Sequence, residues 1–283
     1  MADPATPAST VKPRGTELAL RVGSALVLAP LAAGTAYVGG WPFAIFWSLA
    51  AIGVFWEWSA LVAGQERRPV VMVGAAALVF SFVLAGAGRL MGAFIVIALG
   101  LMATAPIAPL RHRGWVAGGV PYAAAIAIAP IVLRSDSEDG FLAMLFVFAI
   151  VWSTDIVAYF VGRLIGGPKL LPQVSPKKTW SGAIGGLAAA VLGAIALAEL
   201  AGLAGALALA LIAALLSCVA QAGDLFESFL KRKFGAKDSS HLIPGHGGLM
   251  DRLDGFVFAA AVAAAIGILR GGLEGPARGL LIW

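Results

Sequence analysis

The sequence predicts an all-α protein, a polytopic transmembrane helical bundle of about nine spans. Its residues are 60% hydrophobic and 12% charged, and this charged share is about half the ~25% that globular domains carry. Apolar runs of roughly 20 residues recur along the chain, which is the length a helix needs to cross ~30 Å of hydrocarbon. A transmembrane barrel would instead require alternating strands of ~10 residues, and the sequence has no such alternation.

Nine apolar runs define the expected helices in order along the chain. A polar tail rich in Pro, Ala and Thr (residues 1–17) precedes them and is expected to be disordered and cytoplasmic. The first run is interpreted as an uncleaved helix rather than a signal peptide, because it continues past its small residues and further spans follow. The runs cover residues 18–38, 41–64, 70–88, 90–110, 115–133, 140–162, 181–199, 203–222 and 255–270.

The distribution of positive charge predicts how the bundle is oriented. With the N-terminus in the cytoplasm, 16 of the 20 Lys and Arg residues fall in inside segments and 4 fall outside. The positive-inside rule expects this asymmetry, so we expect a multi-pass protein of the inner cell membrane. A basic cytoplasmic face attracts anionic lipid headgroups, so the net charge of +5 indicates a membrane lipid partner and no nucleic acid.

Charged residues are concentrated in the second half of the chain. Ten of them lie between residues 223 and 255, in a chain with 20 Lys and Arg and 15 Asp and Glu. Because buried charge is expensive in lipid, this block predicts a site for a metal and a phosphorylated ligand. We therefore expect N-terminal transmembrane helices (18–140) and a catalytic transmembrane domain (141–283). Two cytoplasmic polar loops of that domain, 163–180 and 223–254, can converge on one site.

The first polar loop follows the sixth span. Asp155, Tyr159 and Arg163 are spaced i, i+4 and i+8, so they share one face of a helix. An acid about two turns inside the end of a span must face protein or a watery cavity. Asp155 is therefore either a structural partner of Arg163 or of another helix, or a direct ligand.

The segment just before the seventh span presents two cations and two hydroxyls: Ser175, Lys177, Lys178 and Thr179. In one interpretation the lysines grip phosphate as point charges. In the simpler one, a hydroxyl caps the start of the next helix and Trp180 lies at the membrane interface.

Carboxylates from the eighth and ninth spans predict a site for a hard cation. Asp224, Ser228 and Lys231 share a helical face on the cytoplasmic extension of the eighth span, and Asp251 and Asp254 share one at the start of the ninth. Asp224 and Asp251 can meet across the two helix ends, and carboxylates with water and phosphate oxygens suit Mg²⁺. Stabilisation of the helix dipole explains one acid at the first turn of the ninth span, but not the whole set.

A glycine-rich turn, Pro244-Gly-His-Gly-Gly248, lies between these two groups of carboxylates. Glycines adopt backbone conformations that are closed to other residues and let N–H groups approach an anion, so Gly247 and Gly248 are expected to bind substrate. His246 is expected to position or hydrogen-bond phosphate, because phosphate nucleophiles are largely ionised at neutral pH and need no general base.

These residues resemble the signature of a known family, the phosphatidate cytidylyltransferases or CDP-diacylglycerol synthases. The resemblance covers roughly residues 153–255, and Ser181 departs from it because the family commonly carries Glu there. The matching downstream residues are Ser228, Lys231-Arg232, Lys237-Asp238, Pro244, His246-Gly-Gly248, Asp251-Arg252 and Asp254. The matching upstream residues are Asp155, Ala158-Tyr159, Gly162-Arg163 and Ser175-Pro-Lys-Lys-Thr-Trp180.

The resemblance implies that phosphatidate and CTP react to give CDP-diacylglycerol and pyrophosphate. It implies Mg²⁺, with K⁺ as an optional second ion, and a homodimer with a polar cavity that faces the cytoplasm. Asp224 and Asp251 would be metal ligands, with Asp254 behind them. The residues that would bind phosphates or complete the catalytic set are Lys231, Arg232, Lys237, Asp238, His246 and Arg252.

Two rival classes are compatible with a polar cluster in a membrane protein. A secondary transporter would place ionisable residues near mid-membrane and within reach of both sides, whereas this cluster is expected at one face. A lipid kinase or alcohol phosphotransferase would carry a P-loop or a DG…AR…D…D pattern, and neither is present in the sequence.

Overall fold

The structure is a computed structural model that describes residues 14–64, 67–240 and 247–283, with side chains described from residue 26 onward. Helices account for nearly all of its regular structure. The elements are α1 (Arg14–Val38), α2 (Gly40–Ala63), α3 (Arg67–Gly86), α4 (Leu90–Ile107), the 3-10 turn η2 (Leu110–His112), α5 (Arg113–Arg134), α6 (Gly140–Leu164), β1 (Lys169–Leu171), β2 (Ser175–Thr179), α7 (Trp180–Leu200), α8 (Ala206–Lys233), α9 (Met250–Gly271) and α10 (Pro276–Leu281).

The predicted polytopic helical bundle is confirmed. Within the described residues, eight helices are long and apolar enough to cross a membrane, and they correspond to the second to ninth predicted spans. The first predicted span falls on α1. The part of α1 with described side chains, Leu26–Val38, is apolar but shorter than the other eight helices. The chain is helical from Arg14, so the backbone of residues 14–17 already belongs to α1.

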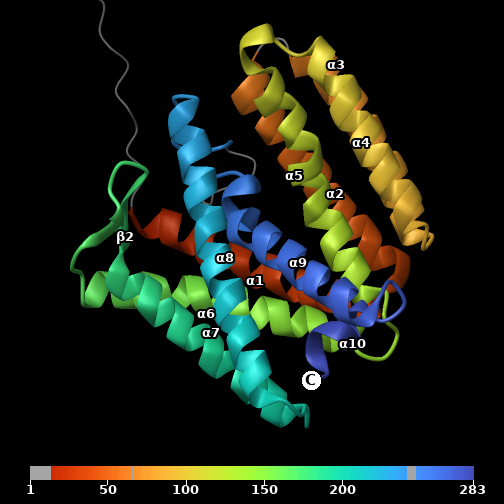
Figure 1. Cartoon of the computed structure of the whole chain (residues 1–283). Helices are drawn as coiled ribbons and strands as arrows, with labels where there is room; N and C mark the ends of the chain where they lie inside the picture. Colours follow the sequence, from red (N-terminus) through yellow and green to blue (C-terminus); the bar gives the residue numbers. More distant parts are fainter. Residues whose placement is uncertain (1–13, 65–66, 241–246) are drawn as a thin grey trace, which may run out of the picture.

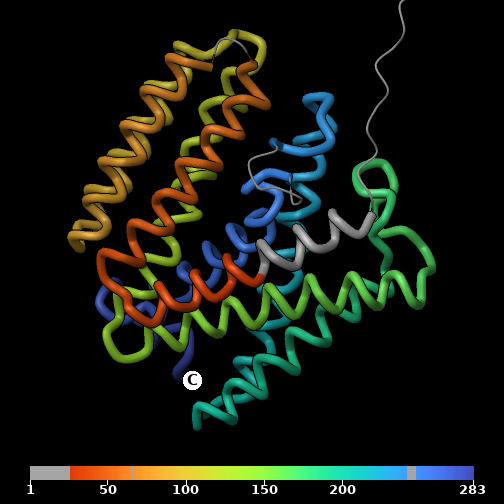
Figure 2. The backbone as a smooth tube through the Cα atoms, turned by 180° about the vertical axis from the view of Figure 1, so that it is seen from behind, coloured from red at the N-terminus to blue at the C-terminus, as the bar shows by residue number. Residues whose placement is uncertain are grey.

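The two polar loops are more regular than the sequence suggested. The first contains an antiparallel hairpin, in which Lys169 pairs with Thr179 and Leu171 with Ser175. In the second, α8 continues through Lys233 and α9 begins at Met250, so most of its charged residues are helical. Figure 1 and Figure 2 show the hairpin at the ends of α6 and α7, on the opposite side of the molecule from the α3–α4 pair.

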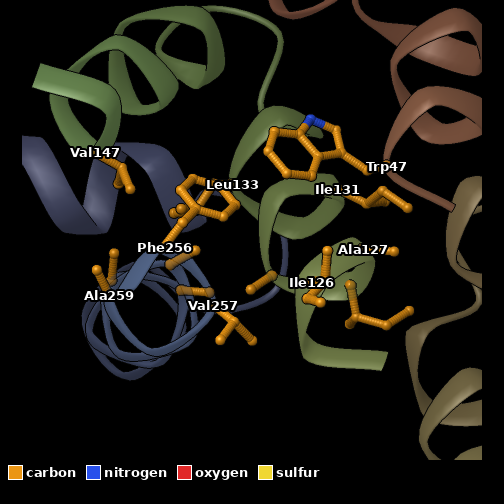
Figure 3. Close-up of a cluster of buried hydrophobic side chains, with 14 of the residues drawn as sticks. Trp47, Ile126, Ala127, Ile131, Leu133, Val147, Phe256, Val257 and Ala259 are labelled. Carbon is orange, nitrogen blue, oxygen red and sulfur yellow. The ribbon is translucent and has the colours of Figure 1, made fainter. Parts of the chain in front are cut away.

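Aromatic packing joins helices from both halves of the chain. Trp47 of α2 stacks on Phe256 of α9, with ring centroids 4.6 Å apart, and also on Phe148 of α6 at 6.2 Å. Figure 3 shows Trp47 and Phe256 beside the buried α5 residues Ile131 and Leu133. Stacked aromatic pairs contribute about 0.5–1.5 kcal/mol beyond the area they bury, and here they hold α9 against α2.

Small residues allow α6 and α7 to approach closely. The buried positions of α7 recur every four residues and are all Gly or Ala: Gly182, Gly186, Ala190, Ala194 and Ala198. Helices in lipid associate through van der Waals packing rather than a hydrophobic driving force, and a stripe of small residues lets the backbones come together. This packing fixes the end of α6, the hairpin and the start of α7 relative to one another.

We predict that Gly186→Ala destabilises the protein, because a Cβ there would lie 2.7 Å from the carbonyl oxygen of Thr154. Overpacking of this kind typically costs about 1–3 kcal/mol. Gly193→Ala is the matched control on the same helix, since its Cβ would meet only the Ser153 hydroxyl at 3.7 Å. Thermal unfolding in detergent measures both variants. Equal unfolding temperatures would contradict the proposed close contact.

Candidate active site

One cavity of about 830 Å³ lies at the end of the bundle that carries the hairpin. This volume is within the ~300–1,000 Å³ of small-molecule sites. Its walls come from the last turns of α6, the hairpin, the start of α7, the polar end of α8 and the first turn of α9. The charged residues that line it are Asp155, Arg163, Lys169, Lys177, Lys178, Asp224, Glu227, Lys231, Asp238, Asp251, Arg252 and Asp254.

The hairpin is attached to α7 by a helix cap. Thr179 is the N-cap residue of α7, and its hydroxyl accepts a hydrogen bond from the backbone N–H of Gly182 at 3.2 Å. The capping role proposed for this segment is therefore confirmed. Gly162 of α6 packs on the same hydroxyl, where a Cβ would come within 2.9 Å. The cap thus places strand β2 and its lysines over the cavity.

Lys178 points from β2 to a group of carboxylates on three helices. Its ammonium forms an ion pair with Asp224 of α8. The carboxylate of Asp254 in α9 interacts electrostatically with Asp224 and with Asp155 of α6, and Lys178 offsets part of this repulsion. Like charges held together in a low dielectric favour a cation between them. In this structure the Lys178 ammonium partly provides that cation.

Asp155 is not the partner of Arg163. Within the described part of the chain, Arg163 instead donates a hydrogen bond to the hydroxyl of Tyr159 at 2.9 Å, and no ion pair joins it to Asp155. The proposed pairing of Asp155 with Arg163 is therefore wrong, while a structural role against another helix and a ligand role both stay predictions. Asp155 faces the cavity, while Tyr159 and Arg163 form its rim on α6.

A second ion cluster links α8 to α9. Lys231 Nζ lies 2.7 Å from Glu227 Oε2 and 2.5 Å from Asp251 Oδ1. The i, i+4 pairing of Glu227 with Lys231 follows from helix geometry, whereas the contact with Asp251 requires the tertiary fold. The Glu227 side chain is 1% exposed and that of Asp251 is 10% exposed. These are buried charges, so each depends on the ammonium that neutralises it.

The glycine-rich turn places its N–H groups on a carboxylate of the protein itself. Oδ2 of Asp251 accepts hydrogen bonds from the backbone N–H of Gly248 at 2.8 Å and of Ser239 at 3.2 Å, and from the Ser239 hydroxyl at 2.9 Å. Gly247 has φ of 85°, a conformation that favours glycine. In this structure, therefore, the anion that Gly248 meets is Asp251.

The structure brings many of the predicted site residues together around this cavity, but not all of them. The predicted residues in its wall are Asp155, Tyr159, Arg163, Lys177, Lys178, Thr179, Asp224, Lys231, Asp238, Asp251, Arg252 and Asp254. Among the described residues that do not line it are Ser175, Ser228, Arg232, Lys237, Gly247 and Gly248. His246 and Pro244 lie outside the described residues. Their functional roles remain predictions.

Sequence reasoning missed several residues of the site. Lys169 and Gln221 line the cavity. Glu227 also lines it, although the sequence predicted for it only the i, i+4 pair with Lys231, which is confirmed. Ser239 binds Asp251, and Glu57 of α2 lies behind it, fully buried. The signal for Glu57 was present, because an acid inside an apolar span indicates a functional or structural partner. Nothing in the local sequence identifies that partner.

A cavity with both charge signs, at one end of an apolar helical bundle, defines an integral membrane enzyme that handles phosphorylated substrates. Comparison with known proteins specifies the family. The chain matches the cytidylyltransferase family over residues 19–269, and it belongs to that family.

Several relatives carry the same name. A phosphatidate cytidylyltransferase of Brucella abortus biovar 1 (strain 9-941) is 43% identical over 258 residues, which are 90% of this chain and 94% of that protein. A protein of that name from Brucella melitensis biotype 1 has the same identity and coverage. One from Rickettsia felis is 41% identical over 144 residues, which are 48% of this chain and 63% of that protein.

We predict that Lys231→Met destabilises the fold far more than Lys178→Met. Breaking a buried ion pair costs about 3–5 kcal/mol, and Lys231 neutralises two buried carboxylates. Lys178 is the control because its partner Asp224 is 30% exposed, and exposed pairs contribute about 0–1 kcal/mol. Unfolding temperatures in detergent measure the difference. Adding Glu227→Gln to Lys231→Met should recover part of the loss, and equal losses in the two single variants would contradict the prediction.

Proposed function

We propose that this chain transfers a cytidylyl group from CTP to phosphatidate, giving CDP-diacylglycerol and pyrophosphate for phospholipid biosynthesis. The observation that carries the proposal is the charged cavity where the end of α6, the hairpin and the starts of α7 and α9 meet in a lipid-embedded bundle. The family and the printed names of the relatives support the same reaction.

In the proposed reaction a phosphatidate oxygen attacks the α-phosphorus of CTP. The new bond joins that oxygen to phosphorus, and the bond to the bridging oxygen of the β-phosphate breaks, so that pyrophosphate leaves. Both reactants are polyanions, so the protein must hold them together and offset the charge that develops. The cavity cations suited to this task are Arg163, Lys169, Lys177, Lys178, Lys231 and Arg252.

The rim of the cavity on α6 suits an amphipathic substrate. Arg163 and Tyr159 face the cavity, while Phe160, Leu164 and Ile165 are 55%, 82% and 72% exposed. Exposed apolar side chains of a membrane-spanning helix contact acyl chains. Phosphatidate would therefore enter beside α6, with its phosphate toward Arg163 and its acyl chains against this apolar surface, while CTP would enter from water.

The donor set at this cavity fits Mg²⁺. Asp155, Asp224 and Asp254 supply hard oxygen donors whose mutual repulsion a cation would relieve. Within the described residues no three acidic or His side chains are already arranged around one point. Asp224 and Asp251 would hold the ion, with Asp254 behind them. When bound, Mg²⁺ would neutralise phosphate charge. K⁺ is proposed as an optional second ion.

The cavity is proposed to open to the cytoplasm at the inner membrane. Beyond the cavity cations, Arg111 in η2, Arg113 at the start of α5 and Lys233 at the end of α8 lie at helix ends that the positive-inside rule assigns to the cytoplasmic face. A cytoplasmic opening also suits CTP, because a charged nucleotide does not cross the lipid and must reach the site from the cytoplasm. A homodimer remains a prediction, for which the molecular mass in detergent is the measurement.

We predict that Asp224→Asn and Asp251→Asn each lower CTP-dependent liponucleotide formation at least ~100-fold while the protein stays folded, because both carboxylates serve the charged reaction centre. The assay uses purified protein, phosphatidate in mixed micelles, labelled CTP and Mg²⁺. Glu199→Gln is the control, since this exposed carboxylate lies at the far end of α7 and should leave activity unchanged. Full activity of either Asn variant would remove that residue from the site, and equal turnover with ATP would favour a lipid kinase.

A second prediction concerns the metal. Chelation by EDTA should reduce liponucleotide formation at least ~100-fold, because loss of the divalent ion removes several kcal/mol of transition-state stabilisation. Excess Mg²⁺ should restore the activity, whereas Ca²⁺, which prefers longer and more flexible coordination, should restore less. Activity that persists in EDTA would contradict the proposed metal dependence.

A further inference from the structure

We infer that Glu57 of α2 is a positioning residue for this site: it fixes the start of α9 and, through the adjacent residues Ser239 and Ser240, the carboxylate of Asp251. The inference rests on the proposed function for its meaning, although the contacts themselves do not. Glu57 is not among the described residues that line the cavity, so it acts through other groups. It belongs to the N-terminal helices, far in the sequence from the matching motif.

Glu57 is fully buried and accepts hydrogen bonds with both carboxylate oxygens. Oε1 accepts from the backbone N–H of Leu249 at 2.8 Å and from the Ser240 hydroxyl at 2.5 Å. Oε2 accepts from the backbone N–H of Met250 at 2.6 Å, and the Ser239 hydroxyl oxygen lies 3.3 Å from it. The side chain thus joins α2 to residues more than 180 positions later.

The location of Glu57 explains how a charge is tolerated inside an apolar span. The first N–H groups of a helix have no partner within the helix, and the positive end of the helix dipole favours an anion. α9 begins at Met250, and none of its own side chains caps it. Glu57 supplies the missing acceptor from another helix, so the helix end and the buried carboxylate compensate each other.

Ser239 connects this anchor to the cavity. Its hydroxyl lies 2.9 Å from Asp251 Oδ2 and 3.3 Å from Glu57 Oε2, so its single proton is donated to the nearer carboxylate, Asp251. The next residue, Ser240, donates its own hydroxyl proton to Glu57 Oε1 and so holds this segment on Glu57. Gly248 is packed into the same junction. A Cβ at Gly248 would lie 1.8 Å from the Ser239 hydroxyl oxygen and 2.9 Å from Glu57 Oε1. Glu57 and Ser239 therefore leave no room for a side chain at Gly248.

The consequence is that Asp251 is held from two sides. Lys231 binds one of its oxygens, and the Ser239–Gly248 group that Glu57 anchors binds the other. A displacement of about 1 Å at a reacting centre can lower a rate by about 10²-fold. Loss of the Glu57 carboxylate would free both the first turn of α9 and this group, and Asp251 would lose its fixed position.

Glu57→Gln tests the inference, because the amide keeps the volume but offers only one acceptor oxygen to two backbone N–H donors. We expect kcat for CDP-diacylglycerol formation to fall at least ~10-fold, while the KM for phosphatidate, whose proposed contacts are on α6, changes less than ~3-fold. A folded Glu57→Gln protein with kcat within ~2-fold of the unsubstituted chain would overturn the inference.

Arg134→Gln is the matched control. Arg134 also satisfies backbone groups at a helix end. From the last residue of α5 it donates to the carbonyl oxygens of Ala36 at 2.5 Å and Tyr37 at 3.2 Å, which lie in the last turn of α1. This variant should lower the unfolding temperature while kcat of the folded protein is unchanged. A general loss of stability is thereby separated from a loss of positioning.

Hydrogen–deuterium exchange provides a readout that does not require activity. In Glu57→Gln the amides of Leu249 and Met250 should exchange at least ~10-fold faster than in the unsubstituted chain, and in Arg134→Gln they should exchange at the unchanged rate. Unchanged protection in Glu57→Gln would overturn the inference whatever the activity of the variant. An inactive unsubstituted protein that shows the expected exchange would instead overturn the proposed function and leave the anchor standing.

Discussion

The buried first backbone N–H groups of a helix must find acceptors outside it, because they have no partner within the helix. α9 meets this requirement with carboxylates, and those carboxylates determine much of the site. Glu57 accepts from Leu249 and Met250, and Asp251 accepts from Gly248. Each interaction fixes backbone and side chain together. The polar end of the bundle is ordered around this one helix start.

Charge compensation explains how the cavity remains stable before any ligand binds. Carboxylates and cations both line its walls, and several are paired: the buried Lys231 with Glu227 and Asp251, and the more exposed Lys178 with Asp224. A polyanionic substrate would compete for these ammonium groups, and a divalent cation would compete for the carboxylates. Binding both together exchanges one balanced set of charges for another, which lowers the desolvation cost of either alone.

The position of the cavity reflects the two phases from which the proposed substrates come. The α6 rim carries exposed apolar residues beside Arg163, so one wall continues into the lipid-facing surface. The hairpin contributes Lys177 and Lys178 to the wall, and Lys178 pairs there with Asp224. The stripe of small residues between α6 and α7 holds these two walls in register. A lipid and a nucleotide could therefore meet without either leaving its own phase.

The sequence by itself determined the helices and the neighbourhood of the site. Apolar runs specify membrane spans because their length and hydropathy are local properties, and the helical spacing of Asp224 with Lys231, and of Asp251 with Asp254, places these pairs correctly on α8 and α9. The hairpin was not predicted, since its pairing joins two short polar segments without an alternating pattern. Only the tertiary structure decided that Lys178 contacts Asp224, that Gly248 serves Asp251, and that Glu57 caps α9. These contacts join residues from different helices, and no periodicity along the chain encodes which helix ends will meet.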